Sequence, residues 1–274
     1  MNKIAVTGGK GGTGKSTIAA LKALKYAKQN KKVILVDCDV ECPNDYLILG
    51  KKIGKIKKKV YTQYPKIDEN KCTACGECVT ACQENALFQL PQKAPILAKE
   101  LCSGCGACAL VCKTNAIDFE KEVVGKIYKN KIKKNLYLIT GTAKPVTEET
   151  SPVVHATRRY ASKLAKKIKA DYLIIDTAAG THCPVIAALI NIDKAIIVTE
   201  PTPMGNHDLK LILDLVKKLK IKSEIIINQY NLGNSQKTLK LARKRNIKIA
   251  KKIPHKKEIA QAYSRGEIYK LNIL

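Results

Sequence analysis

The feature that most constrains the fold is a glycine-rich loop near the beginning of the chain. Residues 9–16 read GKGGTGKS and match the pattern G-x-x-x-x-G-K-S. The loop follows an apolar strand at residues 3–7 and opens a stretch, 16–29, with apolar residues at helical spacing. Glycines here let backbone N–H groups surround an anion, and the helix start adds its positive dipole end. The sequence therefore predicts a phosphate-binding loop between a strand and a helix.

Individual loop residues have expected tasks. The Lys15 ammonium is expected to reach the β and γ phosphates of a nucleotide, and the Ser16 hydroxyl is expected to bind Mg²⁺. The other predicted nucleotide-binding residues of the loop are Gly9, Lys10, Gly11, Gly12, Thr13, Gly14 and Thr17.

The rest of the chain alternates between apolar strands and helical patterns. The predicted helices cover residues 152–169, 206–220 and 235–245. The predicted strands lie at 33–37, 136–140, 172–176, 195–200, 224–229 and 247–254. We expect a charged hairpin over residues 120–135, with Gly125 at its turn. This order predicts an α/β fold with a doubly wound, mostly parallel sheet.

Eight of the 11 cysteines form two runs with identical spacing, C-x₂-C-x₂-C-x₃-C. Zinc sites usually take separated pairs of cysteines, whereas this run is typical of bacterial ferredoxins with two [4Fe–4S] clusters. The fourth cysteine of each run then ligates the other cluster. One predicted ligand set is Cys72, Cys75, Cys78 and Cys112, and the other is Cys82, Cys102, Cys105 and Cys108. We expect a ferredoxin domain at residues 61–120, inserted between parts of a nucleotide-binding domain at 1–60 and 121–274.

Composition narrows the setting of the protein. The 274 residues contain no apolar run long enough for a membrane span, and the amino-terminal sequence does not resemble a signal peptide. We therefore expect a cytoplasmic protein with no membrane partner. The formal charge of +27 comes from 50 Lys and Arg against 23 Asp and Glu. Because the lysines are spread along the chain, the sequence favours a general surface property over a nucleic-acid site.

Several motifs, in order, resemble the MinD/ParA/Mrp/nitrogenase iron protein class of ATPases. Lys10 in GGKGGTGKS resembles the second lysine of the deviant Walker A loop of that class. VDCD resembles its second-strand motif, IIDTAAG its Walker B strand and INQYN its adenine-reading segment. The resemblance implies that Asp39 orients the attacking water, Asp37 helps to fix Mg²⁺, Asp176 lies in the Mg²⁺ shell and Asn228 reads adenine. Ala178 and Ala179 replace the prolines usual in this class.

The same resemblance implies an ATP-dependent homodimer in which Lys10 acts across the interface. Lys10, Lys15 and Asp39 are then the expected catalytic residues of an ATPase with ATP, Mg²⁺ and two [4Fe–4S] clusters as cofactors. The favoured hypothesis is nucleotide-driven electron transfer to a redox partner protein. The alternatives are cluster delivery to an apoprotein acceptor, as in Mrp-type carriers, and DNA binding, as in ParA. Cys38, Cys42 and Cys183 lie outside the two runs, and a further cluster on them stays open.

Overall fold

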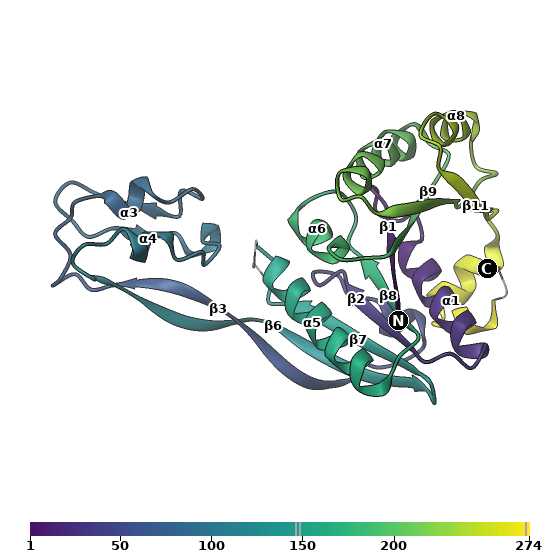
Figure 1. Cartoon of the computed structure of the whole chain (residues 1–274), viewed down its shortest axis with the longest axis horizontal. Coiled ribbons are helices and arrows are strands. Elements are labelled where there is room, and N and C mark those ends of the chain that lie inside the picture. The colour runs from purple at the N-terminus through teal and green to yellow at the C-terminus, as the bar shows by residue number, and fades with distance from the viewer. Residues whose placement is uncertain (146, 148, 272) are drawn as a thin grey trace.

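The computed structural model describes residues 1–145, 147, 149–271 and 273–274. Within these residues, a nine-stranded sheet has the order β11-β10-β9-β1-β8-β2-β7-β6-β3 (Figure 1). Seven strands are parallel: β1 (Asn2–Thr7), β2 (Val33–Cys38), β7 (Leu136–Ala143), β8 (Tyr172–Thr177), β9 (Lys194–Thr199), β10 (Lys222–Ile227) and β11 (Lys248–Lys252). The last two, β6 (Ile117–Lys133) and β3 (Lys55–Ile67), are antiparallel. The predicted mostly parallel α/β sheet is confirmed.

Helices cover both faces of the parallel sheet. One face carries α5 (Ser151–Ile168), α6 (Cys183–Leu189), α7 (Pro203–Lys218) and α8 (Gln236–Lys244). The other face carries α1 (Lys15–Lys28), α2 (Asp45–Ile48), α9 (Lys257–Ser264) and the 3₁₀ turn η2 (Ile268–Lys270). In β2, Ile34 and Val36 enter the first core while Val33 and Leu35 enter the second. This double burial explains why the central strands are continuous apolar runs.

The predicted hairpin at 120–135 is wrong. Residues 117–133 form the single strand β6, and the chain turns only before β7 begins at Leu136. Gly125 lies within this strand, where a Cβ atom would approach the Thr142 carbonyl oxygen to 2.6 Å and the Val153 side chain to 2.7 Å. The absence of a side chain at Gly125 therefore permits α5 to pack closely on the sheet. The sequence pattern alone cannot distinguish a glycine needed for close packing from a glycine needed for a turn.

Strands β3 and β6 continue past the edge of the sheet as a two-stranded ribbon that carries residues 68–116 (Figure 1). We call these residues the cysteine module. The ribbon closes where the Asp68 amide donates to the Ala116 carbonyl at 2.8 Å. The expected domain limits at 60/61 and 120/121 therefore fall inside the ribbon strands. The module contains α3 (Glu77–Thr80), β4 (Leu87–Phe88), β5 (Ile96–Leu97), η1 (Lys99–Leu101) and α4 (Ala107–Leu110).

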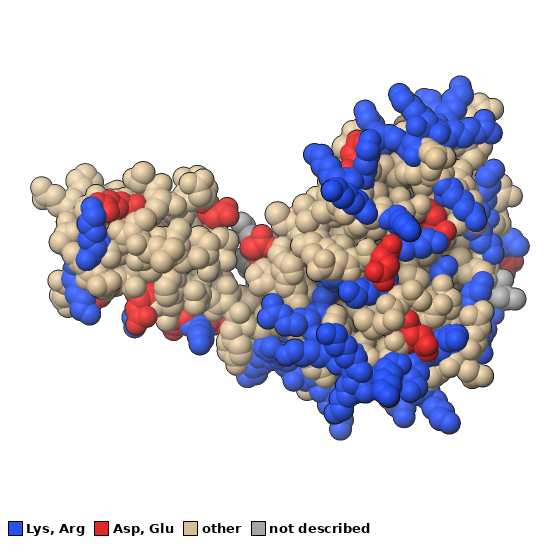
Figure 2. Space-filling view, in the orientation of Figure 1, with Lys and Arg blue, Asp and Glu red and all other residues tan. Residues whose placement is uncertain are grey.

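The positive charge is unevenly distributed. Lys and Arg side chains gather over residues 1–67 and 117–274, which we call the body, whereas the module shows a mostly uncharged surface with a few acidic and basic side chains (Figure 2). Residues 68–116 hold four lysines and five acidic residues. Of the helices that the structure describes, none is long and apolar enough to cross a bilayer.

Candidate functional site

The glycine loop joins β1 to α1, and its backbone borders a cavity of about 380 Å³. The predicted residues that line this cavity are Gly11, Gly12, Gly14, Lys15, Ser16, Thr17, Asp39 and Asn228. Lys15 is the first residue of α1 and only 7% exposed, and its Nζ donates to the Lys10 carbonyl at 3.0 Å. Burial lowers the pKa of Lys15, opposed by the charges of Asp176 and Asp39. The loop, the lysine and two carboxylates thus converge as the sequence predicts.

Other predicted residues lie behind the cavity wall. Thr13 is buried, and its carbonyl accepts a hydrogen bond from Asn228 Nδ2 at 2.9 Å. Gly9 packs against the backbone of Asp208, where a Cβ would meet the carbonyl oxygen at 2.5 Å. These residues shape the loop, whereas Asn228 reaches both the loop and the cavity.

Gly14 offers a direct test of the loop conformation. Its φ is +92°, and a Cβ would approach Asn228 Nδ2 to 2.6 Å. A left-handed conformation costs a side-chain-bearing residue about 1–3 kcal/mol, so Gly14→Ala should lower the free energy of unfolding by that amount. Chemical denaturation of the nucleotide-free protein measures the loss. In Gly11→Ala the same methyl meets nothing within 4 Å, and an equal loss in both variants would contradict this explanation.

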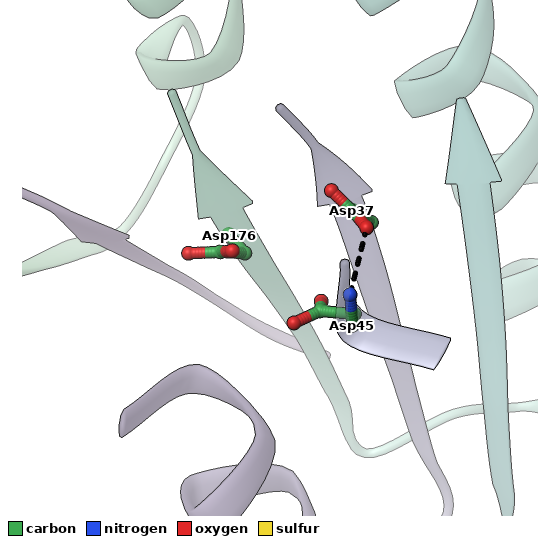
Figure 3. Close-up of side chains that lie close together, drawn as sticks. All are labelled: Asp37, Asp45 and Asp176. Carbon is green, nitrogen blue, oxygen red and sulfur yellow. Dashed lines mark hydrogen bonds between the residues drawn. The ribbon is translucent and has the colours of Figure 1, made fainter. Parts of the chain in front are cut away.

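Three of the predicted acidic residues, Asp37, Asp39 and Asp176, lie at or just after the carboxyl ends of β2 and β8. Asp37 and Asp176 are direct neighbours across these parallel strands (Figure 3). Asp37 accepts backbone N–H bonds from Asp39 at 3.2 Å and from Asn44 and Asp45 at 3.1 Å. Burial raises the pKa of Asp176 to about 7, and it also raises the pKa of Asp37 and of Asp39. Asp39 alone of the predicted acidic set lines the cavity, where an attacking water molecule would have to be held.

Lys10 points away from the cavity within its own chain. Its Nζ lies 2.5 Å from Glu200 Oε1, and Glu200 also accepts from the Thr202 hydroxyl at 3.1 Å. The Lys10 side chain is 38% exposed. Its expected action across a dimer interface stays a prediction, and it would require this ion pair to open.

Sequence reasoning missed one wall of the cavity. Pro254, His255, Lys256, Ile259, Ala260, Tyr263 and Ile273 close it from the carboxyl-terminal segment, and Asn44, Ala179 and Gln229 add to its lining. Glu200 and Asp45 were also missed. A helical pattern over 257–264 is visible in the sequence, but nothing local shows that it folds back over the glycine loop.

The cysteine module repeats one local structure twice. Each run places its third cysteine in a short helix, Cys78 in α3 and Cys108 in α4, and both are buried. The fourth cysteine of each run accepts a backbone N–H bond on its sulfur at 3.3 Å, Cys82 from Ala86 and Cys112 from Ala116. The repeat in the sequence therefore corresponds to a repeat of the same local structure in the two halves of the module.

The two predicted ligand sets gather in space. A cavity of about 350 Å³ is lined by Cys72, Cys75, Cys78 and Cys112, together with apolar and polar residues of both halves. Burial is the main cause of the raised pKa of the Cys78 thiol, and the nearby Cys72 and Cys112 also contribute. Burial likewise raises the pKa of Cys102 and Cys108, with contributions from Cys105 to both and from Cys82 to Cys102. Cys112, the fourth cysteine of the second run, therefore lies beside the first run, and the charge of Cys82 acts on Cys102 of the second run.

The three remaining cysteines differ in exposure. Cys38 at the end of β2 is buried, and burial raises its pKa, so it is a poor metal ligand. Cys42 and Cys183 are exposed, the latter at the start of α6.

Comparisons with known proteins agree with this architecture. Residues 4–269 match the family described as "CobQ/CobB/MinD/ParA nucleotide binding domain". An uncharacterised protein of Methanocaldococcus jannaschii is 40% identical over 97% of this chain and 90% of its own length. The septum site-determining protein MinD of Escherichia coli K12 is 22% identical over 98% of this chain and 84% of its own length.

Solved structures show the same fold. The cell division ATPase MinD of Pyrococcus furiosus gives a TM-score of 0.58 at 17% identity, over 98% of this chain and 89% of that one. MinD of Pyrococcus horikoshii, solved with Mg-ADP, gives 0.57 at 18% identity, over 98% and 88%. With its glycine loop, Lys15 and Asp39 around one cavity, the chain belongs to the CobQ/CobB/MinD/ParA nucleotide-binding family and is an ATPase.

Proposed function

We propose that this ATPase couples nucleotide-driven dimer switching to electron transfer through two [4Fe–4S] clusters held by the cysteine module. The observation that carries the proposal is the gathering of Cys72, Cys75, Cys78 and Cys112 around one cavity. The second set is Cys82, Cys102, Cys105 and Cys108. Clusters bound there would supply one-electron storage and transfer.

The core of the module supports a metal-containing group. Its buried apolar residues, as far as the structure describes them, are Cys78, Ala86, Leu87, Cys108 and Ala116, with a few partly buried neighbours. A unit of this size needs disulfides or metal to be stable when its core is so small. All eleven cysteines are free. The module therefore depends on what its thiolates bind.

The spacing of the sulfurs favours a cluster over a single ion. Among the described residues, which include every cysteine, no three sulfurs lie within 4.8 Å of one another. Zinc, bound about 2.3 Å from each thiolate in tetrahedral geometry, would hold sulfurs about 3.8 Å apart. A four-iron group spans a wider set of ligands, and the backbone N–H bonds to Cys82 and Cys112 are of the kind that tunes cluster potential.

A connected set of hydrogen bonds links the nucleotide site to the ribbon. Just after Asp39, the Val40 carbonyl accepts from the Ala143 amide at 2.7 Å. Glu41 accepts from the Thr150 hydroxyl at 2.9 Å. The Lys144 amide then donates to the Val124 carbonyl, at the base of the ribbon, at 2.7 Å. Movement of the segment after Asp39 on nucleotide binding would therefore act on the strands that carry the module.

The electron-transfer hypothesis includes an ATP-dependent homodimer in which Lys10 leaves Glu200 for a partner's nucleotide. The half-exposed Lys10 side chain supports this part of the proposal. A redox partner protein would dock near the module, whose surface carries less positive charge than the body (Figure 2).

A redox titration of the anaerobic protein, followed by electron paramagnetic resonance with and without MgATP, tests the coupling. We expect the cluster midpoint potential to shift by about 59 mV for each tenfold difference in ATP affinity between the reduced and oxidised protein. Lys15→Ala, which should not hold ATP productively, is the control and should show no shift. Identical potentials with and without MgATP in the unaltered protein would reject the coupling.

A further inference from the structure

The two predicted ligand sets share one backbone arrangement but differ in the side chains beside it. We call Cys72, Cys75, Cys78 and Cys112 the first set and Cys82, Cys102, Cys105 and Cys108 the second set. The third cysteine of each run, Cys78 or Cys108, is 8% exposed. After the fourth cysteine, Asn85 and Asn115 both have a φ of +51°, and the next amide donates to the cysteine sulfur at 3.3 Å. Burial of the third cysteine and these backbone donors therefore do not distinguish the two sets.

The side chain two residues after the fourth cysteine does distinguish them. It is Thr114 after Cys112, and it is Glu84 after Cys82. Thr114 lines the cavity of the first set, and its hydroxyl oxygen lies 3.7 Å from the Cys112 sulfur. A thiolate that ligates iron has no proton, so the hydroxyl must donate this hydrogen bond. The Glu84 carboxylate has no proton to donate and adds a negative charge instead.

Other charged groups reinforce the difference. Lys113 lines the cavity of the first set, but its ammonium pairs with Glu77 at 2.6 Å, so the pair adds little net charge there. The charge of Glu84 acts on Cys102 of the second set, and Glu100 lies two residues before that cysteine. Neither Glu84 nor Glu100 forms an ion pair with a basic residue in the described part of the chain. The second set therefore has the more negative surroundings.

We propose that the first set holds the cluster of higher midpoint potential and the second set the cluster of lower potential, so that an electron added to the module resides at the first set. This order of potentials rests on the proposed function, in which each set holds a [4Fe–4S] cluster. Reduction adds one negative charge to a cluster, which hydrogen-bond donors stabilise and nearby anions oppose. Transfer between the sets oxidises one cluster by one electron, reduces the other by one electron and moves no proton.

The order of potentials also gives the module a direction. Cys102 of the second set lines a cavity of about 310 Å³ together with Lys144 and Glu149 of the body. The cavity of the first set is lined instead by residues of the module and by Ile67 and Ile117 at the end of the ribbon. Electrons that enter at the second set, beside the body, therefore move on to the first.

The test uses the anaerobic, reconstituted full-length protein without nucleotide, titrated with dithionite while electron paramagnetic resonance counts the reduced clusters at each potential. We expect two one-electron steps, with the first set favoured by about tenfold or more, which separates the potentials by about 59 mV or more. Thr114→Val removes the donated hydrogen bond and should lower only the higher potential. Glu84→Gln removes the negative charge and should raise only the lower potential. Each substitution should therefore narrow the separation, by a factor of about three to ten in relative electron affinity.

Thr80→Val is the matched control, because the Thr80 hydroxyl donates to the Gly76 carbonyl rather than to a cysteine sulfur. It should leave both potentials unchanged. If the order were reversed, Thr114→Val and Glu84→Gln would both widen the separation, and that result or two equal potentials in the unaltered protein would overturn the assignment. The two substitutions lie in different halves of the module, so poor folding of one variant leaves the other to decide. A reconstituted protein without iron would instead reject the proposed function itself, and this order of potentials with it.

Discussion

Replacing Lys15 by alanine is expected to reduce ATP hydrolysis by at least about 10²–10³-fold, the loss typical of removing one preorganised group from a charged transition state. Lys15 is 7% exposed, lines the nucleotide cavity and acts electrostatically on Asp39 and Asp176. Alanine would remove the cation that faces the phosphates and leave those carboxylates unbalanced. Phosphate release under anaerobic conditions measures the effect.

A control on the same helix separates this role from general loss of charge. Lys25 is an exposed residue of α1, and Lys25→Ala should keep the rate within a factor of two or so, since exposed substitutions have small effects. Both variants should retain their iron. Hydrolysis by Lys15→Ala within tenfold of the unaltered protein would exclude Lys15 as a catalytic residue, and loss of iron would show that the module and the body are not separable.

The second large effect is expected at Cys112, which lies in the second run but lines the cavity of the first. Cys112→Ser should lower the iron content from about eight to about four per chain, because one four-iron group loses a ligand. Cys72→Ser together with Cys112→Ser should lose no more iron than either change alone. Cys82→Ser together with Cys112→Ser should lose nearly all of it.

Iron analysis after anaerobic reconstitution distinguishes these cases. Cys183→Ser, outside the module, should keep about eight irons. If Cys72→Ser with Cys112→Ser removed both groups while Cys72→Ser with Cys82→Ser removed only one, each run would hold its own group and the crossed assignment would fail.

Local patterns in the sequence were enough to predict the parallel strands, the glycine loop and the repeated cysteines. Each of these depends on residues that are close in the chain, such as strand β1, which ends at Thr7, and the glycine loop that follows it and leads to Lys15. The position of Cys112 beside Cys72, Cys75 and Cys78 agrees with the spacing typical of bacterial ferredoxins, in which the fourth cysteine of a run reaches the other cluster. Features that depend on distant contacts were missed or misread.

Gly125 and Asp45 show why. A glycine among charged residues looks like a turn, yet Gly125 is needed because α5 approaches it from another part of the chain. An aspartate before a short apolar stretch looks solvated, yet Asp45 becomes fully buried because α2 packs against α1 and β7 and places its carboxylate near those of Asp37 and Asp176. The pair of Lys10 with Glu200 joins residues far apart in sequence, so no local pattern could reveal it.

The projecting ribbon acts as a lever. Residues 117–124 of β6 extend beyond the strand's pairing with β7, which is about 27 Å at the usual rise of a β-strand. A rotation of about 5° at the base would then displace the far end by about 2 Å. If the proposed coupling holds, small movements after Asp39 would be amplified at the cysteines, and shortening both ribbon strands by matched pairs would reduce the amplitude without altering either site.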